Sequence, residues 1–184
     1  MKEDMTYLCI NAADASSQNL SQHFKESIRF IHECRLNGGA CLVHWWVCPL
    51  EYGFIFVWYC DMLCLAGVSR STTMVVAYLM TVTNYGWEEC LTAVKAVRSF
   101  VGPNYGFQQQ LQEFQMKQVL EYRAWLRTSY RPSPFKDQEQ VEALLSLYTE
   151  QQQQGQQNDL DLMSQGSRIY PLSYHQYSAS GSKR

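Results

Sequence analysis

An eight-residue segment, CLAGVSRS from Cys64 to Ser71, contains residue types that can bind and attack an anion. Cys64 is followed, after five residues, by Arg70, and a helix is expected to begin at Ser71. The guanidinium of Arg70 can hold two oxygens of one tetrahedral oxyanion. The backbone N–H groups that can form a concave anion-binding nest belong to Leu65, Ala66, Gly67, Val68, Ser69 and Arg70. The sequence therefore predicts a phosphate-binding loop that ends at a helix N-terminus.

The same surroundings predict that the thiol of Cys64 is ionised. N–H donors, an arginine and a helix N-terminus lower the pKa of a cysteine to about 3.5–7.5, whereas a free cysteine has a pKa of about 8.5. Cys64 is then expected to be a thiolate at neutral pH and to attack a phosphate ester in line, while the N–H donors stabilise the charge on the equatorial oxygens. Ser71 can donate a hydrogen bond to the sulfur when it leaves in a second step.

Such a reaction also needs a general acid, because the leaving alkoxide or phenoxide must be protonated. Asp14 is the candidate, since it lies in a polar loop, Asn11–Ser17, directly after a short apolar segment. A single aspartate in a loop is more often a cap or a turn residue. The loop position alone therefore leaves both interpretations of Asp14 open.

The composition indicates one globular domain with a tail. Of the 184 residues, 46% are hydrophobic and 17% are charged, so the chain can bury a sizeable core and is not wholly disordered. The formal net charge of −2 shows no basic excess, so nucleic acid is not expected as a ligand. Position 2 is lysine and the N-terminus lacks a long apolar segment, so neither N-myristoylation nor a signal peptide is expected.

The seven cysteines do not follow the short, repeated spacing of a zinc site, so no metal is expected. Their number is odd, which favours free thiols in a reducing compartment. The cysteines expected in the hydrophobic core are Cys9, Cys34, Cys41 and Cys90.

Hydrophobic periodicity predicts strands alternating with helices, which is typical of an α/β domain. Short apolar runs predict strands over residues 7–10 and 40–43. Helices are predicted over residues 18–35, 71–85, 87–100, 104–126 and 137–148. The apolar positions that share one face of the first helix are Leu20, Phe24, Ile28 and Ile31. Ser16 or Ser17 can cap this helix, and the sequence Asn37-Gly38-Gly39 is expected to end it.

Residues 45–63, WWVCPLEYGFIFVWYCDML, are far more apolar and aromatic than their surroundings. Together with the residues up to Val68 they are long enough to raise the question of a membrane span. Glu51, Asp61 and Pro49 interrupt the segment, and charges near the centre of a span are costly. An extra hairpin or a poorly accommodated insertion is therefore favoured, and no transmembrane span is expected.

The chain resembles the atypical dual-specificity protein phosphatases, a family of cysteine-based protein phosphatases. The resemblance covers about residues 7–44 and 64–135 and is carried by three segments, YLCINAADASSQNLSQHFKESIRFIHECRLNGGACLVH, CLAGVSRSTTMVVAYLMTVTNYGWEECLTAVKAVRS and PNYGFQQQLQEF. It implies that Cys64 is the phosphocysteine nucleophile, Arg70 the phosphate-binding arginine and Asp14 the general acid. Ser71 matches the hydroxyl residue that follows the arginine in this family. The fold implied is a central mixed sheet flanked by helices.

The resemblance also implies an activity and a setting. Members of the family hydrolyse phosphotyrosine and phosphoserine or phosphothreonine in proteins and need no metal or organic cofactor. The partners implied are phosphorylated proteins, including components of kinase cascades such as the JNK and MAPK pathways, in the cytoplasm and nucleus. The domain expected is residues 1–135, followed by a short helix or extension over 136–150 and a disordered Gln- and Ser-rich tail over 151–184.

Two departures from the family pattern bear on activity. The family places a histidine directly before the nucleophile, whereas residues 45–63 separate His44 from Cys64 here. The family also has further N-terminal strands, so the domain is expected to be truncated at its N-terminus. Displacement of a catalytic group by about 1 Å can cost roughly a hundredfold in rate, so impaired activity is predicted.

Other classes of protein remain as alternatives. A catalytically inactive relative that binds phosphoproteins, or acts as a scaffold, would keep the same anion-binding loop. Low-molecular-weight phosphatases and arsenate reductases also use C-x5-R, but they carry the acid far downstream of the cysteine, whereas Asp14 precedes Cys64. A thiol redox enzyme is disfavoured because the chain contains no C-x-x-C motif.

Overall fold

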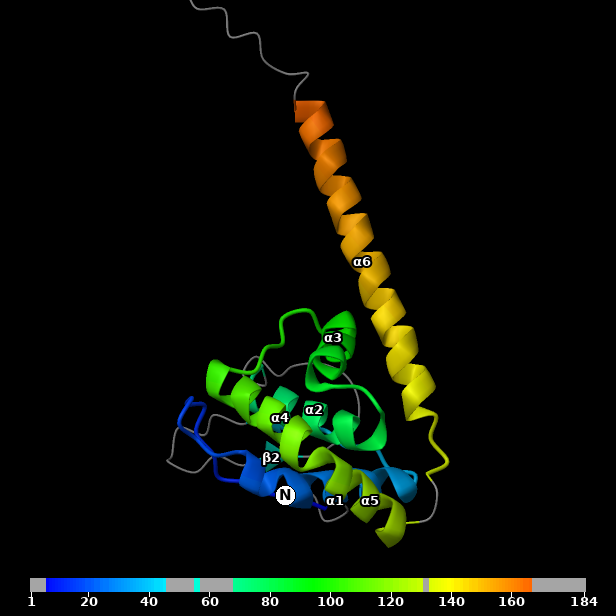
Figure 1. Ribbon diagram of the computed structural model, residues 1–184. Coiled ribbons are helices and arrows are strands. Elements are labelled where there is room, and N and C mark those ends of the chain that lie inside the picture. The colour runs from blue at the N-terminus through cyan, green and yellow to red at the C-terminus, as the bar shows by residue number, and fades with distance from the viewer. Residues whose placement is uncertain (1–5, 46–54, 57–67, 131–132, 167–184) are drawn as a thin grey trace, which may run out of the picture. The chain divides into compact units, whose positions relative to one another are not determined.

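The structure is a computed structural model that describes residues 6–45, 55–56, 68–130 and 133–166 (Figure 1). It divides into two compact units, Met1–Tyr148 and Thr149–Arg184, which are described separately. The elements in chain order are the 3-10 helix η1 (Ser21–His23), α1 (Phe24–Leu36), β1 (His44–Trp45), β2 (Ile55–Phe56), α2 (Arg70–Val82), α3 (Trp87–Val97), α4 (Tyr105–Lys117), α5 (Val119–Ser129) and α6 (Asp137–Gly166).

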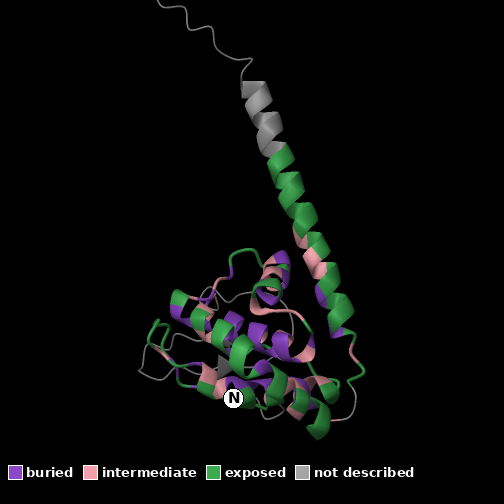
Figure 2. Cartoon of the chain, viewed as in Figure 1, coloured by how far each residue is buried: buried purple, intermediate pink, exposed green. Residues whose placement is uncertain are grey.

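Helix α2 is the central element of the first unit and contacts α1, α3, α4 and α5. Along these helices, buried positions alternate with exposed ones, as expected for helices that share a core (Figure 2). The ring of Phe114 lies edge-on to the ring of Phe24, with 5.1 Å between the ring centroids, and edge-on to Tyr122 at 5.0 Å. The predicted core face is confirmed, because Phe24, Ile28 and Ile31 of α1 are at most 7% exposed, and Leu20, just before η1, is fully buried.

The long helix predicted over residues 104–126 is two helices, because the backbone leaves helical geometry at Gln118. Phe107, Leu111 and Phe114 follow helical spacing, which would next place Gln118 in the core. The apolar residue is instead Val119, one position later, and it is 4% exposed. The break at Gln118 thus shifts the register by one residue and turns the apolar face of α5 toward the core.

The first predicted helix also begins later than expected, and neither predicted cap is used. The helical region starts with η1 at Ser21. Its N-cap residue is Leu20, whose side chain forms no capping hydrogen bond. The predicted stop is confirmed, since Gly38 has a φ of 73° and its N–H donates to the carbonyl of Arg35. Glycine suits this left-handed position because it has no Cβ.

The strands predicted over residues 7–10 and 40–43 are not assigned as strands. Residues 8–12 still alternate, since Ile10 and Ala12 are buried whereas Cys9 and Asn11 are exposed. In the described part of the chain, the hydrogen-bonded ladder is antiparallel, pairing His44 with Phe56 and Trp45 with Ile55. This pairing agrees with a hairpin within residues 45–63, of which residues 46–54 and 57–63 lie outside the described part.

The four cysteines predicted in the core differ in burial. Cys90 is fully buried, and burial raises the pKa of its thiol to about 12. Cys9 is exposed, so that prediction is wrong, because the residue falls on the outward side of the alternating segment. Cys34 and Cys41 are half-buried, and the Sγ of Cys34 donates to the carbonyl of Ala40 at 3.3 Å.

Helix α6 is longer than predicted and reaches Gly166. Residues 151–166, expected in a disordered tail, are helical, because glutamine, leucine and methionine favour helices and Gly155 interrupts the run at one position within the helix. The first turn is joined to α1 by an ion pair, with 2.7 Å between Arg35 Nη2 and Asp137 Oδ1. None of the helices in the described ranges is long and apolar enough to cross a membrane.

Candidate active site

The described part of the predicted phosphate loop is its junction with α2. Cys64, Leu65, Ala66 and Gly67 lie outside the described residues. Ser69 is the N-cap of α2, and Arg70 is its first residue. Arg70 and Ser71 are 8% and 5% exposed, respectively, so both are held in the interior at the start of the helix. The N-terminus of α2, with the positive end of its dipole, therefore lies one residue before the predicted start at Ser71.

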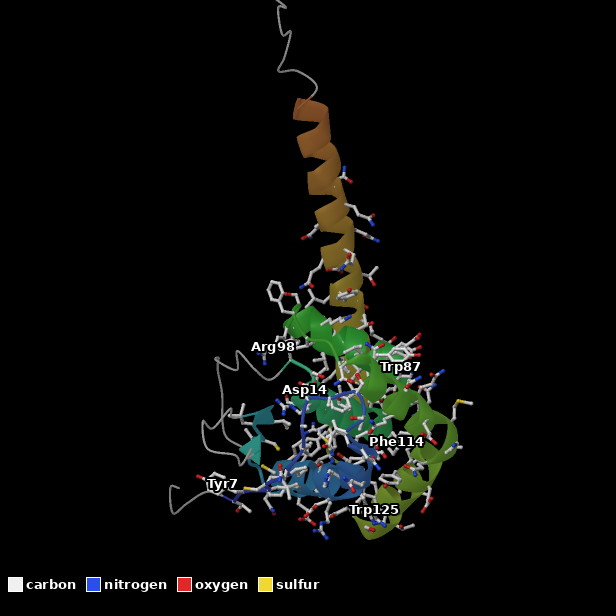
Figure 3. The ribbon with its side chains drawn as sticks, turned by 90° about the vertical axis from the view of Figure 1, so that its left-hand side faces the viewer. Tyr7, Asp14, Trp87, Arg98, Phe114 and Trp125 are labelled. Atoms are coloured by element: carbon white, nitrogen blue, oxygen red, sulfur yellow. The ribbon has the colours of Figure 1, made fainter. Side chains whose placement is uncertain are left out.

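The structure brings Arg70 and Asp14 together, although they are far apart in the sequence. The Nε of Arg70 lies 3.4 Å from Oδ2 of Asp14, and its Nη1 donates to the carbonyl of Ala12 at 3.0 Å. The side chain of Asp14, labelled in Figure 3, is 32% exposed on the loop that precedes α1. Asp14 therefore faces the arginine and stays accessible from solvent.

Asn104 joins three parts of this site. Its Nδ2 donates to Oδ1 of Asp14 at 2.9 Å, and its backbone N–H donates to Oγ of Ser69 at 3.0 Å. Its Oδ1 accepts from the N–H of Phe107 at 3.0 Å and so caps α4. The sequence Pro103-Asn104 predicts the start of a helix, but the contact with Asp14 is a long-range one that the sequence pattern does not reveal.

Further bonds hold the residues between the loop and α2. The N–H of Gly102 donates to the carbonyl of Val68 at 3.1 Å. The hydroxyl of Thr72 donates to the same carbonyl at 2.9 Å, and the hydroxyl of Thr73 donates to the carbonyl of Ser69 at 2.8 Å. The end of the predicted phosphate loop is therefore bonded both to α2 and to the segment that precedes α4.

The loop that carries Asp14 packs directly on the first turn of α4. Gly106 is buried there, and a Cβ added to it would lie 2.7 Å from Cα of Ser16 and closer still to the Ser16 carbonyl oxygen. A side chain at position 106 would therefore push the loop away. As for metals, the described residues contain no group of three or more histidines, cysteines or acidic residues that could hold an ion.

Comparison with known proteins identifies the class of the chain. Residues 61–117, which include the loop from Cys64 to Ser71 and Asn104, match the family "Dual specificity phosphatase, catalytic domain". Dual specificity protein phosphatase 22-A of Danio rerio is 82% identical over 182 residues, which cover 99% of this chain and 78% of the relative. Dual specificity protein phosphatase 22 of Homo sapiens is 52% identical over 146 residues, covering 79% of this chain and 69% of the relative.

A solved structure supports the same conclusion. The crystal structure of DUSP15 matches with a TM-score of 0.59 and 44% sequence identity, over 72% of this chain and 73% of the other. The fold is thus that of the dual-specificity phosphatases, which are protein phosphatases. The chain belongs to the atypical dual-specificity protein phosphatase family, as its resemblance to that family predicts.

Proposed function

We propose that the chain hydrolyses phosphotyrosine and phosphoserine or phosphothreonine in proteins through a phosphocysteine intermediate. Cys64 is the nucleophile, Arg70 binds the phosphate, Asp14 is the general acid, and Ser71 assists the departure of the sulfur. The observation that carries the proposal is the distance of 3.4 Å between Arg70 and Asp14. An acid beside the phosphate-binding group can reach the ester oxygen of a phosphate held there.

In the first step, the Cys64 thiolate attacks phosphorus and forms the S–P bond. The bond between phosphorus and the ester oxygen breaks, its electron pair moves to that oxygen, and Asp14 donates its proton to the leaving group. The guanidinium of Arg70 and the N–H groups of the loop stabilise the charge on the equatorial oxygens. These N–H groups belong to Leu65, Ala66, Gly67, Val68, Ser69 and Arg70.

In the second step, water attacks the phosphocysteine and Asp14, now a carboxylate, accepts the proton of that water. The S–P bond breaks, its electron pair returns to sulfur, and inorganic phosphate is released. Ser71 donates a hydrogen bond to the departing sulfur anion, which is supported by its buried position next to Arg70. The cycle needs no metal or organic cofactor, because the acid, nucleophile and phosphate-binding groups all belong to the chain.

The finer features of the fold and setting are part of this proposal. A central mixed sheet, with residues 40–43 as one of its strands, is supported by the likeness to the DUSP15 structure. Residues 1–135 form the phosphatase domain and 136–150 an extension of it. The substrates are phosphoproteins of kinase cascades, such as the JNK and MAPK pathways, in the cytoplasm and nucleus.

Turnover of 4-nitrophenyl phosphate and of phosphotyrosine and phosphothreonine peptides by the full chain tests the proposal. Cys64→Ser should abolish turnover of every substrate and still retain a phosphopeptide on an affinity matrix. Asp14→Asn should lower kcat for phosphotyrosine by about a hundredfold, in the range expected for loss of a general acid. Turnover that survives Cys64→Ser would contradict the proposal.

We further propose that residues 45–63 reduce this activity. The pairing of His44 with Phe56 supports this, because the histidine that comes just before the insertion forms a β-ladder with a residue of the insertion. Removing residues 45–63 joins His44 to Cys64, and kcat/KM for 4-nitrophenyl phosphate should then rise. Equal rates with and without the segment would refute the effect. If the full chain retains phosphopeptides without turning them over, it acts instead as an inactive binding or scaffold protein.

A further inference from the structure

The loop that carries Asp14 is held by a side chain from the middle of α4. Gln110 donates from Nε2 to the carbonyl of Gln18 at 2.8 Å. Its Oε1 accepts from the N–H of Leu20 at 2.7 Å and from the N–H of Ser21 at 3.1 Å. A single amide group therefore bonds the end of the loop and the start of the helical region that follows.

These bonds add to the local capping of the helical region. The first N–H groups of a helix have no partner within the helix, and a serine or aspartate just before it usually accepts from them. Here the N-cap residue provides no side-chain bond, and Gln110 of α4 accepts from two of these N–H groups, while Asn19 Oδ1 accepts from the N–H of Gln22 at 3.4 Å. The start of η1 is therefore tied to α4 as well as to the residue just before it.

A second link extends from Gln18 to the residue before the acid. Gln18 Oε1 accepts from the N–H of Ala13 at 3.2 Å, and the N–H of Gln18 donates to the carbonyl of Ala15 at 3.0 Å. Gln110 therefore fixes the Gln18 backbone, and the Gln18 side chain bonds the peptide next to Asp14. Asn104, the N-cap residue of α4, donates to the Asp14 carboxylate itself, so the carboxylate is bonded to Asn104 and its loop is bonded to Gln110.

We propose that Gln110 is a positioning residue for the general acid, acting through the loop from Ala13 to Gln18. This inference rests on the proposed role of Asp14. Only an amide long enough to reach can donate to Gln18 and accept from Leu20 and Ser21 at once. Loss of the amide releases the loop, and the carboxyl group of Asp14 then moves relative to the phosphate bound by Arg70.

Dependence on the leaving group separates this role from a general structural one. Phenyl phosphate has a poor leaving group that needs protonation, whereas 4-nitrophenolate leaves with less help from an acid. Gln110→Ala should therefore lower kcat for phenyl phosphate by about tenfold to a hundredfold and change kcat for 4-nitrophenyl phosphate much less. Gln112→Ala is the matched control, because Gln112 is an exposed glutamine on the same helix.

A double-mutant cycle with Asp14→Asn tests whether Gln110 acts through the acid. If it does, Gln110→Ala has no further effect on phenyl phosphate once Asp14 is already asparagine. Equal losses on both substrates, or full additivity of the two substitutions, would overturn the proposal. If Asp14→Asn itself leaves the ratio of kcat for phenyl phosphate to kcat for 4-nitrophenyl phosphate as it is in the parent, that result would refute the proposed acid role of Asp14 and, with it, the positioning role of Gln110.

Amide hydrogen exchange on the full chain gives a measurement that does not depend on turnover. Gln110→Ala should accelerate exchange at Leu20, Ser21 and Ala13, and leave exchange in the centre of α2 unchanged. Gln110→Glu keeps an acceptor for Leu20 and Ser21 but loses the donor to Gln18, so it should accelerate exchange mainly at Ala13. Unchanged exchange at Leu20 and Ser21 in Gln110→Ala would also overturn the proposal.

Discussion

Substitution of Asn104 separates the stability of α4 from the placement of Asp14, the proposed general acid. Asn104→Ala removes the Oδ1 cap of Phe107 and the Nδ2 bond to Asp14, while the backbone bond to Ser69 can remain. Asn104→Ser keeps a good N-cap acceptor but lacks the amide that donates to Asp14. The two variants therefore differ in whether α4 keeps its N-cap, and both lose the hydrogen bond to Asp14.

The expected size of the effect follows from these two bonds. An N-cap replaced by alanine costs about 1 kcal/mol. A hydrogen bond to a charged group contributes about 1.5–3 kcal/mol when buried, and about 1 kcal/mol here because the Asp14 side chain is 32% exposed. Asn104→Ala should thus cost about 2 kcal/mol, which corresponds to a fall in Tm of about 4–8 °C for a chain of this size.

Thermal unfolding and steady-state kinetics on the same preparations measure both effects. Asn104→Ser should recover about half of the lost stability, yet both variants should hydrolyse phosphotyrosine about equally poorly. If Asn104→Ser retains the full activity of the parent, the bond between Asn104 and Asp14 does not position the acid. A Tm for Asn104→Ala equal to that of the parent would refute the role of Asn104 as a cap.

Three further properties should follow from buried groups outside the site. Burial lowers the pKa of His32 below its ordinary value of 6.5. As the pH drops below 6.5, the unfolded chain therefore binds a proton at this histidine before the folded chain does, and the free energy of unfolding should fall. Urea unfolding of His32→Gln should show a weaker fall in this pH range. The raised pKa of Cys90 should make it one of the last of the described cysteines to react with iodoacetamide, well after the more exposed Cys34. Mass spectrometry of timed samples measures the order of reaction. A reaction of Cys90 before Cys34 would contradict the prediction. Phe114→Ala removes a fully buried ring that contacts two aromatic neighbours, so it should lower the free energy of unfolding by about 3–5 kcal/mol. Phe114→Leu should lower it less. Equal losses of stability in chemical denaturation would argue against a specific packing of the ring.

Local patterns predict the face and the end of the first helix. The spacing of Leu20, Phe24 and Ile28 predicts the buried face of α1, and Gly38 predicts its end, because both are encoded within a few residues. The sequence leaves open which residues of the third helix are buried. The structure places Ala96 in the core and leaves Val97 73% exposed, which depends on how α3 lies on α2.

The parts that could not be predicted depend on distant residues. The break at Gln118 follows from the position of Val119 relative to the core, and no glycine or proline marks it. The spacing to Cys64 predicts that Arg70 binds phosphate, but no spacing predicts the bond from Asn104 to Asp14, which forms only when α4 packs on the loop. The bonds that Gln110 supplies have the same origin, because a residue of another helix accepts from the N–H groups of Leu20 and Ser21.

The tight packing of Gly106 on Ser16 has a consequence for attempts to stabilise this protein. Replacing a glycine inside a helix by alanine normally stabilises the helix by up to about 1 kcal/mol. At position 106 the added methyl group would occupy the space of the Ser16 backbone, so the same change should loosen the loop that carries Asp14, the proposed general acid, and lower activity. A substitution that usually raises thermal stability would therefore reduce catalysis here. The effect would be measured as a lower kcat with an unchanged helical circular dichroism signal.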